Sequence, residues 1–410
     1  MSQPRPRLLA VFGEHAYGDP ARGPGYEYTN FLPAFRRLGY EVTLFDSFAR
    51  APYRDFAELN RRFLEVVQRE NPDIIFCVLS GYELWSETLE LVRDGCRAAL
   101  VHWATDDSWK YEQFSRFVAP PFDVYATTYP EALAKSRRDG HDNFRLSQWA
   151  ADAAGLAEPL PAGQCRYPAS FVGAAYGNRP RRIDALRRRG IEVACFGHGW
   201  PNGPVATLEL QEIIRSSVVS LNFGDSGIHL KGLKPYRSRQ IKARIFEVPG
   251  AGGLLATEET EHLGDYLRPG EEIVVFRDAD DLAQKIRQLL DHPAERDRIA
   301  RAGHRRVRAE HTYDRRFESL FEQAQTAAAE RRPTGELDRS AFEVAVERHR
   351  VGPGLEQLRK TLTAPLRLIC GPRRGPRAAR RLLFELSWRL AGAHTYSAAG
   401  WPGRLFYRES

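Results

Sequence analysis

Short apolar runs alternate with amphipathic stretches over the first 150 residues of the chain. The apolar runs are typical of strands buried on both faces of a parallel sheet, and the stretches between them carry apolar residues at the three- and four-residue spacing of helices. The predicted strands lie at 8–12, 41–45, 74–79, 98–103, 123–127 and 144–146, and the predicted helices at 29–38, 55–70 and 83–94. This alternation predicts a doubly wound parallel α/β domain at residues 1–150.

The same alternation starts again after a stretch rich in Pro, Ala and Gly at 150–164. Strands are predicted at 169–173, 192–196, 218–223, 253–257 and 272–276, and helices at 179–189, 208–215, 238–248, 279–290, 294–310 and 313–329. A second Rossmann-like domain is therefore expected at 165–330. Two such domains joined by a short linker predict a cleft between them, with ligands at the carboxyl ends of the strands.

The last 80 residues, 331–410, follow a different pattern. A helix is predicted at 338–349, and two basic amphipathic stretches follow a Gly-Pro-Gly break at 352–354. In the second stretch, 376–390, arginines lie largely opposite one apolar helical face. That face consists of Ala379, Leu382, Leu383, Leu386 and Leu390. A basic helical extension is expected here.

Charge is distributed unevenly along the chain. The net charge is +7, but residues 331–410 hold 16 basic and 7 acidic residues, which leaves 44 basic and 46 acidic residues in 1–330. The slightly acidic main body is a poor electrostatic footprint for nucleic acid, so we expect no nucleic-acid partner. The segment 359–390 contains nine basic residues and one acidic residue. Such a segment either binds an anionic membrane surface or packs as a scaffold on the domains.

Composition predicts a globular protein of a reducing compartment. Hydrophobic residues make up 42% and charged residues 28% of the chain, and no apolar run reaches the roughly 18 residues of a membrane-spanning helix. The five cysteines are scattered and form no C-x-x-C pair, so neither a disulfide framework nor a zinc site is indicated. We expect a cytoplasmic location, peripheral on the inner face of the membrane if the extension binds lipid.

Two segments at predicted strand ends of the first domain are candidates for substrate contact. The Gly-rich loop from Gly13 to Gly25 could bring its backbone close to a phosphate, but it lacks the G-x-G-x-x-G spacing of a dinucleotide site. The alternative is a plain crossover loop. His102, Asp106 and Asp107 follow the fourth predicted strand and could contact acceptor hydroxyls or act as a general base. The alternative for either aspartate is capping of the next helix.

The second domain offers candidates for donor binding. Its first strand leads through Gly173 into a basic helix, a geometry that suits a diphosphate with charge supplied by Arg179 or Arg182. His198 lies in a Gly-rich loop after the next strand, where a base or ribose could be held against Trp200. The alternative for that loop is a structural turn.

The segment 238–257 combines several features of an anion site. A helix beginning near its start would end at a Gly cluster that contains Gly252 and return to an apolar strand. The helix N-terminus, Lys242 and Arg244 would bind an anion, and Glu247 could accept hydrogen bonds from ribose hydroxyls. The alternative is an Arg244–Glu247 surface pair at positions i and i+3.

Five segments of the second domain carry a family resemblance: QIKARIFEVPGAGG at 240–253, PGEEIVVF at 269–276, DDL at 280–282, AGHRRV at 302–307 and EHTYDRR at 310–316. In these segments the chain resembles the spore-maturation CgeB-like glycosyltransferases, which look like GT-B enzymes related to the group-1 glycosyltransferases. The match is dense over 165–320 and looser over 8–150, and it does not cover the extension.

The resemblance implies a GT-B fold, a nucleoside-diphosphate sugar as co-substrate, and neither a cofactor nor a metal. In group-1 enzymes the corresponding helix carries the second Glu of a Glu-x7-Glu pair, which places the ribose contact on Glu247. The first Glu of the pair would fall at Arg239, so donor-sugar contacts and a retained anomeric configuration do not carry over. Basic residues around Lys242 and Arg244 would bind the diphosphate.

We therefore expect a hexosyltransferase-type glycosyltransferase that moves a sugar to an acceptor hydroxyl on a glycan, a lipid-linked molecule or a small molecule. The predicted catalytic residues are His102, Asp106 and Asp107. The predicted donor-binding residues are Gly13, Gly173, Arg179, His198, Lys242, Arg244, Glu247 and Gly252. The alternative function is that of a catalytically silent GT-B protein that binds a glycan or a nucleotide.

Overall fold

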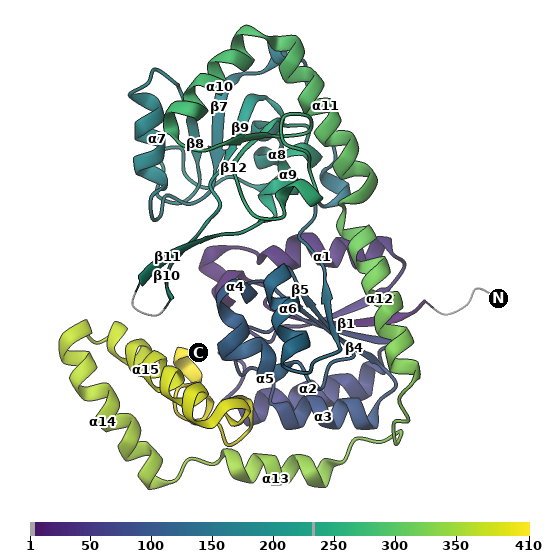
Figure 1. Ribbon diagram of the computed structural model, residues 1–410. Coiled ribbons are helices and arrows are strands. Elements are labelled where there is room, and N and C mark those ends of the chain that lie inside the picture. The colour runs from purple at the N-terminus through teal and green to yellow at the C-terminus, as the bar shows by residue number, and fades with distance from the viewer. Residues whose placement is uncertain (1–4, 232–233) are drawn as a thin grey trace. The chain divides into compact units, whose positions relative to one another are not determined.

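The computed structural model describes residues 5–231 and 234–410, and it describes side chains for all of these outside 225–238. The chain divides into two compact units (Figure 1). Unit 1 comprises Met1–Ser147 and Phe317–Ser410, and unit 2 comprises Gln148–Arg316. The first boundary lies close to the predicted end of the first domain, whereas the second lies inside the predicted second domain.

Unit 1 contains a six-stranded parallel sheet in the order β2-β1-β3-β4-β5-β6. Its strands are β1 (Arg7–Val11), β2 (Glu41–Phe45), β3 (Ile74–Cys77), β4 (Ala99–Ala104), β5 (Val124–Thr127) and β6 (Phe144–Leu146). The helices between them are α1 (Tyr26–Arg37), α2 (Phe56–Glu70), α3 (Ser86–Gly95), α4 (Asp107–Lys110), α5 (Arg116–Val118) and α6 (Pro130–Arg138). The predicted doubly wound domain is confirmed, and β2 and β6 have the predicted bounds.

Local signals in the sequence set both ends of α2. The Asp55 carboxylate accepts a hydrogen bond from the Glu58 backbone N–H (2.9 Å) and so caps the first turn. Asn71, at a left-handed φ of 42°, ends the helix. The apolar face between these ends, which includes Phe63 and Val67, is buried in the core of unit 1.

The helix α12 (Tyr313–Ala329) has the predicted bounds, but most of it belongs to unit 1. The Phe317 ring lies 4.7 Å from the Phe35 ring and 5.4 Å from the Phe76 ring, measured between centroids. Phe321 packs on the same two rings. The last helix of the predicted second domain, 165–330, thus buries its aromatic face in unit 1.

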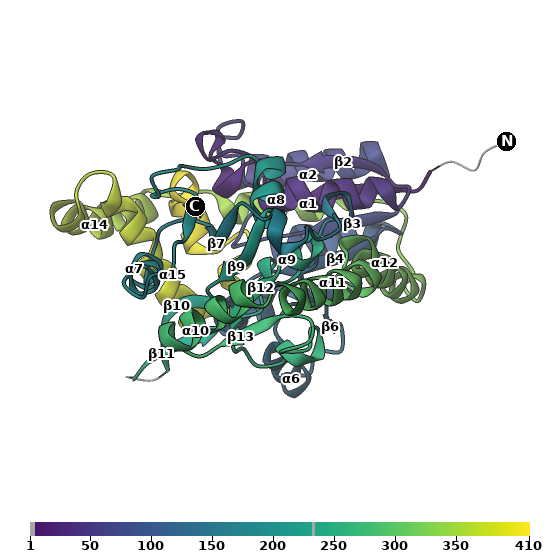
Figure 2. The same cartoon turned by 90° about the horizontal axis from the view of Figure 1, so that it is seen from above.

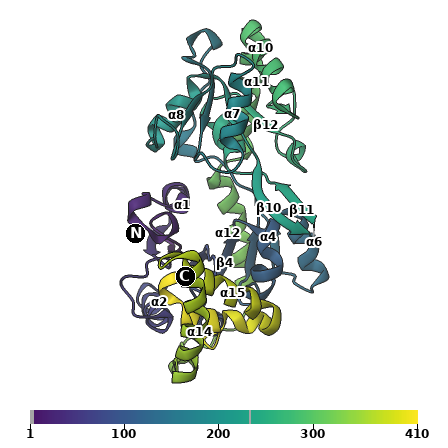
Figure 3. The same ribbon diagram turned by 90° about the vertical axis from the view of Figure 1, so that its left-hand side faces the viewer.

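The extension 331–410 also packs into unit 1 and is not a separate third part. Its helices are α13 (Arg339–His349), α14 (Pro353–Cys370), α15 (Arg374–Ala391) and α16 (Trp401–Leu405). Phe342 of α13 stacks on Trp85, and the Tyr407 hydroxyl donates to the Arg50 carbonyl oxygen (2.9 Å). Figure 3 shows α14 and α15 packed side by side as a helical hairpin. None of the helices in the described parts of the chain has the length and apolar character needed to cross a membrane.

Unit 2 contains a five-stranded parallel sheet in the order β13-β12-β9-β7-β8 (Figure 2). Its strands are β7 (Tyr167–Val172), β8 (Ala194–Phe196), β9 (Ser217–Asn222), β12 (Leu255–Glu258) and β13 (Val274–Phe276). The helices around it are α7 (Arg179–Arg187), α8 (Thr207–Arg215), α9 (Arg244–Gly250), α10 (Ala279–Asp291) and α11 (Pro293–Glu310). The predicted second Rossmann-like domain is confirmed.

The predicted helix at 238–248 is wrong at its start. The backbone there pairs antiparallel as β10 (Asp225–Lys231) and β11 (Lys234–Arg239), with Ile228 opposite Arg237, and α9 begins only at Arg244. Pairing with an earlier segment of the chain overrides the local helical pattern of these residues. The positive end of the helix dipole therefore lies at Arg244 and not near residue 238.

A buried ion pair joins the start of the extension to the sheet of unit 1. The Arg331 guanidinium lies 3.0 Å from the carboxylate of buried Asp123, and it donates to the carbonyl oxygens of Arg93 and Ala98 (2.6 Å each). The same carboxylate accepts from the Leu100 backbone N–H of β4 (2.8 Å). Arg331 thus connects the extension to α3 and β4.

Replacement of Arg331 by alanine is expected to destabilise unit 1 by about 3 kcal/mol, because it leaves the buried Asp123 carboxylate without its cation. Denaturant unfolding of the full chain measures the loss. The matched control is Arg332→Ala, since Arg332 is exposed and adjacent. Equal unfolding midpoints for the two variants would contradict the assigned role of the ion pair.

Candidate functional site

Both large sheets reverse their winding next to their first strand. In unit 1 the chain goes from β1 to β2 on one side and returns to β3 on the other, and in unit 2 it goes from β7 to β8 and returns to β9. In open parallel sheets the carboxyl ends of the strands at such a switch point are where ligands bind. The candidates for ligand contact are therefore the residues that follow β1, β3 and β4 in unit 1, and β7, β9 and β12 in unit 2.

His102 lies inside β4 and is fully buried. Its Nε2 accepts a hydrogen bond from the Leu79 backbone N–H (3.2 Å), and its ring stacks on Tyr125 at a centroid distance of 4.4 Å. Burial lowers the pKa of His102 to about 3, so the ring is neutral. The predicted contact of His102 with the acceptor is therefore corrected: the side chain supports the loop after β3 from within the core.

Asp107, the first residue of α4, is buried as well. Its carboxylate accepts a hydrogen bond from the Ser115 hydroxyl, and burial raises its pKa to about 6. The side chain makes no capping hydrogen bond, and neither does that of Asp106, which occupies the N-cap position of α4. Neither the predicted substrate contact nor the capping alternative describes Asp107.

Asp106 has an accessible side chain, about 42% exposed, and it lies among other charges. The Lys110 ammonium is 3.9 Å from its carboxylate. Burial raises the pKa of half-buried Glu27, in the first turn of α1, and a backbone hydrogen bond lowers it. The negative charge of Asp106 raises this pKa further, and the positive charge of Lys110 opposes the shift. Two carboxylates and one ammonium thus meet on the segments that follow β1 and β4. A carboxylate with a raised pKa is a stronger base than an ordinary carboxylate and so a better proton acceptor.

Sequence reasoning missed Glu27. The signal that pointed to it was an acidic residue in the first turn of the helix that follows the Gly-rich loop. An acid there is expected from the helix dipole alone, so the signal was not specific. Only the approach of Asp106 and Lys110, which lie about eighty residues later in the chain, distinguishes Glu27 from an ordinary helix-start residue.

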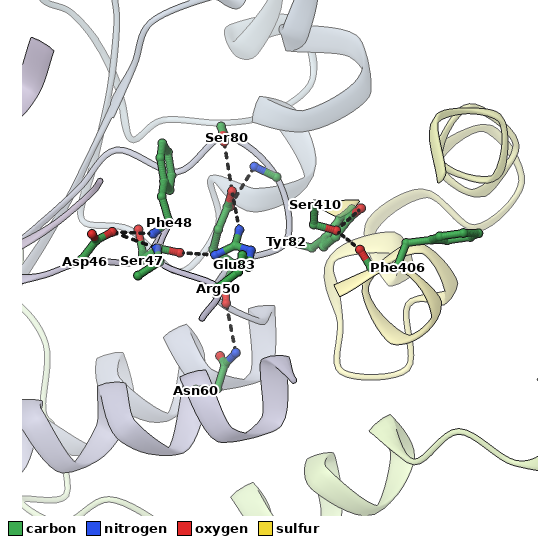
Figure 4. Close-up of polar contacts among 12 residues, drawn as sticks. Asp46, Ser47, Phe48, Arg50, Asn60, Ser80, Tyr82, Glu83, Phe406 and Ser410 are labelled. Carbon is green, nitrogen blue, oxygen red and sulfur yellow. Dashed lines mark hydrogen bonds and ion pairs between the residues drawn. The ribbon is translucent and has the colours of Figure 1, made fainter. Parts of the chain in front are cut away.

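A buried carboxylate organises the loop after β3 (Figure 4). Glu83 accepts hydrogen bonds from the Ser80 hydroxyl (2.9 Å) and the Gly81 backbone N–H (2.8 Å), and the Arg50 guanidinium lies 3.8 Å away. The Asn60 side chain of α2 donates to the Glu83 carbonyl oxygen (3.0 Å). These contacts hold the loops after β2 and β3 in one arrangement.

Gly13, at the end of β1, is packed closely by Phe48. A Cβ at Gly13 would lie 2.7 Å from the Phe48 ring, so a larger residue would require that ring to move. Phe48 is held in turn because its backbone N–H donates to the Asp46 carboxylate (2.9 Å). The donor contact of Gly13 stays a prediction.

Within the described residues, one group could hold a metal ion. It consists of Glu14, His15 and Asp46, whose ligand atoms all lie within 4.8 Å of one another.

A second buried carboxylate, Glu258, ends β12 in unit 2. The Arg182 guanidinium lies 2.6 Å from it and the Arg239 guanidinium 3.4 Å. The Gly224 backbone N–H, directly after β9, donates to the same carboxylate (3.1 Å). Arg182 also lies over the Phe223 ring, 5.3 Å from its centroid. Two guanidinium groups thus lie against a buried carboxylate at the carboxyl edge of this sheet, and guanidinium groups are well suited to binding a phosphate group.

Glu258 was not among the predicted site residues, and Arg182 was only the second choice after Arg179. A sequence signal for Glu258 existed, because an acidic residue directly follows the apolar run of β12. In a parallel sheet such a residue lies at the ligand edge. The Arg182–Glu258 pairing itself joins residues 76 positions apart and has no local signature.

The loops after β7 and β8 are hydrogen-bonded to each other. The Trp200 indole N–H donates to the Gly173 carbonyl oxygen (2.8 Å), and the Ala175 backbone N–H donates to the His198 carbonyl oxygen (2.8 Å). Arg179 donates to the Ala174 carbonyl oxygen (3.0 Å) of its own loop. Trp200 therefore forms a structural turn, as the alternative proposed, while the His198 side chain is exposed.

The three residues predicted to contact the donor around α9 lie near its N-terminus. Lys242 precedes the helix, and Arg244 and Glu247 lie in its first turn. The Arg244 guanidinium is 3.2 Å from the Glu247 carboxylate, so the i, i+3 pair is present. The Gln240 backbone N–H donates to the carbonyl oxygen of Gly224 (3.2 Å), and Gly224 follows β9. The segment that leads into α9 therefore starts at the carboxyl end of β9.

Gly252 is placed at the opposite edge of the sheet. It lies between the end of α9 and the start of β12, at a φ of 81°, and a Cβ there would be 2.6 Å from the Ala157 carbonyl oxygen. A residue that precedes a parallel strand lies at the amino edge. Gly252 packs closely against the segment at 157–158, and its predicted donor contact stays a prediction.

Residues 179–322 match a protein-family model described as Glycosyl transferase-like. The match runs from the start of α7 into α12 and so covers the Arg182 and Glu258 edge of unit 2. None of the curated proteins matches this chain.

Many solved structures have a similar fold. Sucrose-phosphate synthase from Thermosynechococcus elongatus is 14% identical at a TM-score of 0.55, over 78% of this chain and 100% of that chain. AviGT4, a glycosyltransferase involved in avilamycin A biosynthesis, is 15% identical at a TM-score of 0.53, over 80% and 99%. Anabaena Alr3699/HepE in complex with UDP and glucose is 11% identical at a TM-score of 0.53, over 78% and 99%. The chain has a GT-B fold.

The raised pKa of Asp107 predicts how the stability of unit 1 changes with pH. Because its pKa is raised in the folded state, the folded protein binds this proton more tightly than the unfolded chain does. The free energy of unfolding should therefore fall as the pH rises from about 4 to about 6. Asp107→Asn removes that loss and should stabilise unit 1 on the order of 2 kcal/mol at pH 7, with no gain below about pH 4.

Denaturant unfolding of wild type and Asp107→Asn at the two pH values measures this difference. The control is Asp106→Asn, the neighbouring position with an exposed side chain, where we expect a small change only. A gain of equal size at both pH values would show that ionisation of Asp107 is not its source.

Proposed function

We propose that this protein transfers a sugar from a nucleoside-diphosphate donor to an acceptor hydroxyl. One observation carries the proposal: the match to the glycosyl transferase-like family falls on the unit whose sheet edge gathers Arg182 and Arg239 around Glu258. A protein of similar fold, Alr3699/HepE, was solved with UDP and glucose bound. Both points support a nucleotide-sugar donor on unit 2.

In this proposal the donor diphosphate lies against Arg182 and Arg239. As the bond between the anomeric carbon and the phosphate oxygen breaks, negative charge grows on the leaving diphosphate, and guanidinium groups stabilise it. Lys242 and Arg244 add positive charge at the start of α9, and Glu247 accepts hydrogen bonds from the ribose hydroxyls. These side chains supply the charge stabilisation, and we assign no metal or cofactor to the step.

The acceptor is proposed to bind at the carboxyl edge of unit 1. Glu27 takes the proton of the acceptor hydroxyl while the acceptor oxygen forms its bond to the anomeric carbon. The raised pKa of Glu27 makes its carboxylate a stronger base, and Lys110 balances the two negative charges of Glu27 and Asp106. Asp106 is accessible and is proposed to hold the acceptor by its hydroxyl groups.

The second candidate is a silent GT-B protein that binds a nucleotide or a glycan without transfer. It is favoured by Arg239, which stands where the group-1 resemblance expects the first Glu of the pair, and which is engaged with Glu258. Release of nucleoside diphosphate on incubation with donor and acceptor separates an enzyme from such a protein.

We further propose a cytoplasmic location, because all five cysteines are free thiols.

Binding of a nucleoside diphosphate should raise the unfolding temperature of the wild-type protein. A panel of UDP, GDP, dTDP and CDP identifies the base, since a ligand at 100 times its dissociation constant adds about 2.7 kcal/mol. Arg182→Ala should weaken binding of the active nucleotide at least tenfold, because a hydrogen bond to a charged group contributes about 1.5–3 kcal/mol.

Two variants keep this experiment interpretable. Arg181→Ala changes the exposed neighbour on the same helix and should leave binding unchanged. Arg182→Lys keeps a cation beside Glu258 and so separates nucleotide binding from loss of folding. Stabilisation of the Arg182→Ala variant equal to that of wild type would remove Arg182 from the donor site.

Glu27→Gln should lower kcat by about 10²- to 10⁴-fold while leaving nucleotide affinity unchanged, because it removes a general base. In the wild type, kcat should fall as the pH drops through the raised pKa of Glu27, since the base must be ionised. Release of nucleoside diphosphate measures both effects. The control is Glu41→Gln, an exposed acid at the start of β2, on the amino edge of the same sheet. Unchanged kcat in Glu27→Gln would overturn the assigned base and leave sugar transfer itself standing.

A further inference from the structure

The α14–α15 hairpin has an inner face that is packed and an outer face that is not. The inner faces of the two helices pack on each other and on α16 and the residue after it. The residues of this small core are Leu355, Leu358, Leu362, Leu366, Ala379, Leu383, Leu405 and Phe406. The inner face explains why the hairpin folds.

The outer face carries large apolar side chains in water. On α15, Leu382 is 46% exposed, Leu386 47% and Leu390 80%, and their four-residue spacing aligns them in one stripe. At the end of α14, Leu368 is 89% exposed and Ile369 78%. Ile369 is three residues beyond Leu366, so it continues the apolar stripe of α14 past its last packed leucine. Single exposed apolar residues are ordinary on a protein surface, but a set of five on one hairpin indicates an interaction surface.

Arginines border these apolar residues. Four exposed arginines lie in the turn between the helices and along the first half of α15, and they are Arg373, Arg374, Arg377 and Arg381. Over 359–390 the chain has nine basic residues and one acidic residue, Glu385, which pairs with Arg389 (2.5 Å). A partner of matching chemistry offers both anionic groups and an apolar phase. An anionic lipid surface has both, because its phosphates lie directly above its acyl chains.

The middle of α15 is anchored to the proposed acceptor edge of unit 1. The Phe384 ring of α15 packs on Tyr82 and Tyr396 (6.4 Å each between centroids), and Tyr396 packs on Phe114 (5.3 Å). The Ser410 hydroxyl lies 3.1 Å from the Tyr82 hydroxyl oxygen (Figure 4). Tyr82 follows β3 and Phe114 follows β4, so the hairpin contacts the loops at the carboxyl edge of the sheet.

We propose that the α14–α15 hairpin docks this protein on an anionic lipid surface. The outer leucines and Ile369 enter the boundary between headgroups and acyl chains, and the bordering arginines contact lipid phosphates. The anchorage to the loops after β3 and β4 brings the acceptor edge of unit 1 close to that surface. The acceptor is then a lipid-linked molecule, a conclusion that rests on the proposed function, whereas the docking itself does not.

The test is co-sedimentation of the full-length protein with lipid vesicles in the absence of any nucleotide. Vesicles of phosphatidylcholine alone are compared with vesicles that contain about one-third phosphatidylglycerol. We expect at least tenfold tighter binding to the anionic vesicles, and at least a tenfold loss when the salt concentration is raised about tenfold, because salt screens the arginines. Equal binding to both vesicles, or binding to neither, overturns the proposal.

Two sets of variants test the two parts of the surface. A triple variant that combines Leu382→Ser, Leu386→Ser and Leu390→Ser should reduce vesicle binding at least tenfold. A double variant that combines Arg373→Glu and Arg374→Glu should do the same. The matched controls change the exposed Leu146, Leu208 and Leu290 to Ser, and the exposed Arg301 and Arg305 of α11 to Glu. Circular dichroism and thermal unfolding verify that every variant is folded, which is expected because the changed side chains face water.

The other occupants of this surface are distinguishable outcomes. If the leucine variant turns a dimer into a monomer in sedimentation velocity and leaves vesicle binding unchanged, the surface is an interface with a second copy and the lipid proposal is wrong. The nucleotide stabilisation described above is measured without vesicles. Failure of lipid docking and failure of sugar transfer are therefore separate results.

Discussion

The direction of the strands is the constraint on which this molecule depends. Within each of the two large sheets the paired strands run parallel, so their carboxyl ends gather at one edge and the loops that follow them meet there. In unit 2 this brings Glu258 at the end of β12 to Arg182, which follows β7. In unit 1 it brings Asp106, after β4, to Glu27, after β1. The same constraint places Gly252, which precedes a strand, at the other edge.

Four acidic side chains of this protein differ in role because their surroundings differ. Glu258 and Asp123 are buried beside guanidinium groups, whose positive charge offsets part of the cost of burial and which connect distant segments. Asp107 is buried beside a hydroxyl, and burial shifts its pKa upwards. Glu27 lies between these cases, half-buried beside one like and one opposite charge. A raised pKa in a side chain that is not fully buried is what a proton acceptor needs, and Glu27 combines the two.

The sequence of the extension allows two interpretations, a scaffold and a lipid-binding surface, and the α14–α15 hairpin has features of both. Its inner leucines pack as a scaffold, and the Arg331–Asp123 pair ties its beginning to the sheet. Its outer leucines and arginines remain available for a surface of complementary chemistry. A single amphipathic pattern on α15 predicts one apolar face, but the packing divides that face: Leu383 is buried and Leu382 is not.

The sequence by itself determined the order and type of nearly all elements, because buried parallel strands and amphipathic helices differ in period over short stretches. The segments 41–45, 144–146 and 313–329 have the predicted bounds. What the tertiary structure decided involves partners far apart in the chain. Residues 234–239 pair as a strand, so the helix predicted from residue 238 begins later. His102 is buried within the sheet, and Arg182 forms an ion pair with Glu258. Burial and ion pairing are properties of the folded neighbourhood, and no local pattern contains them.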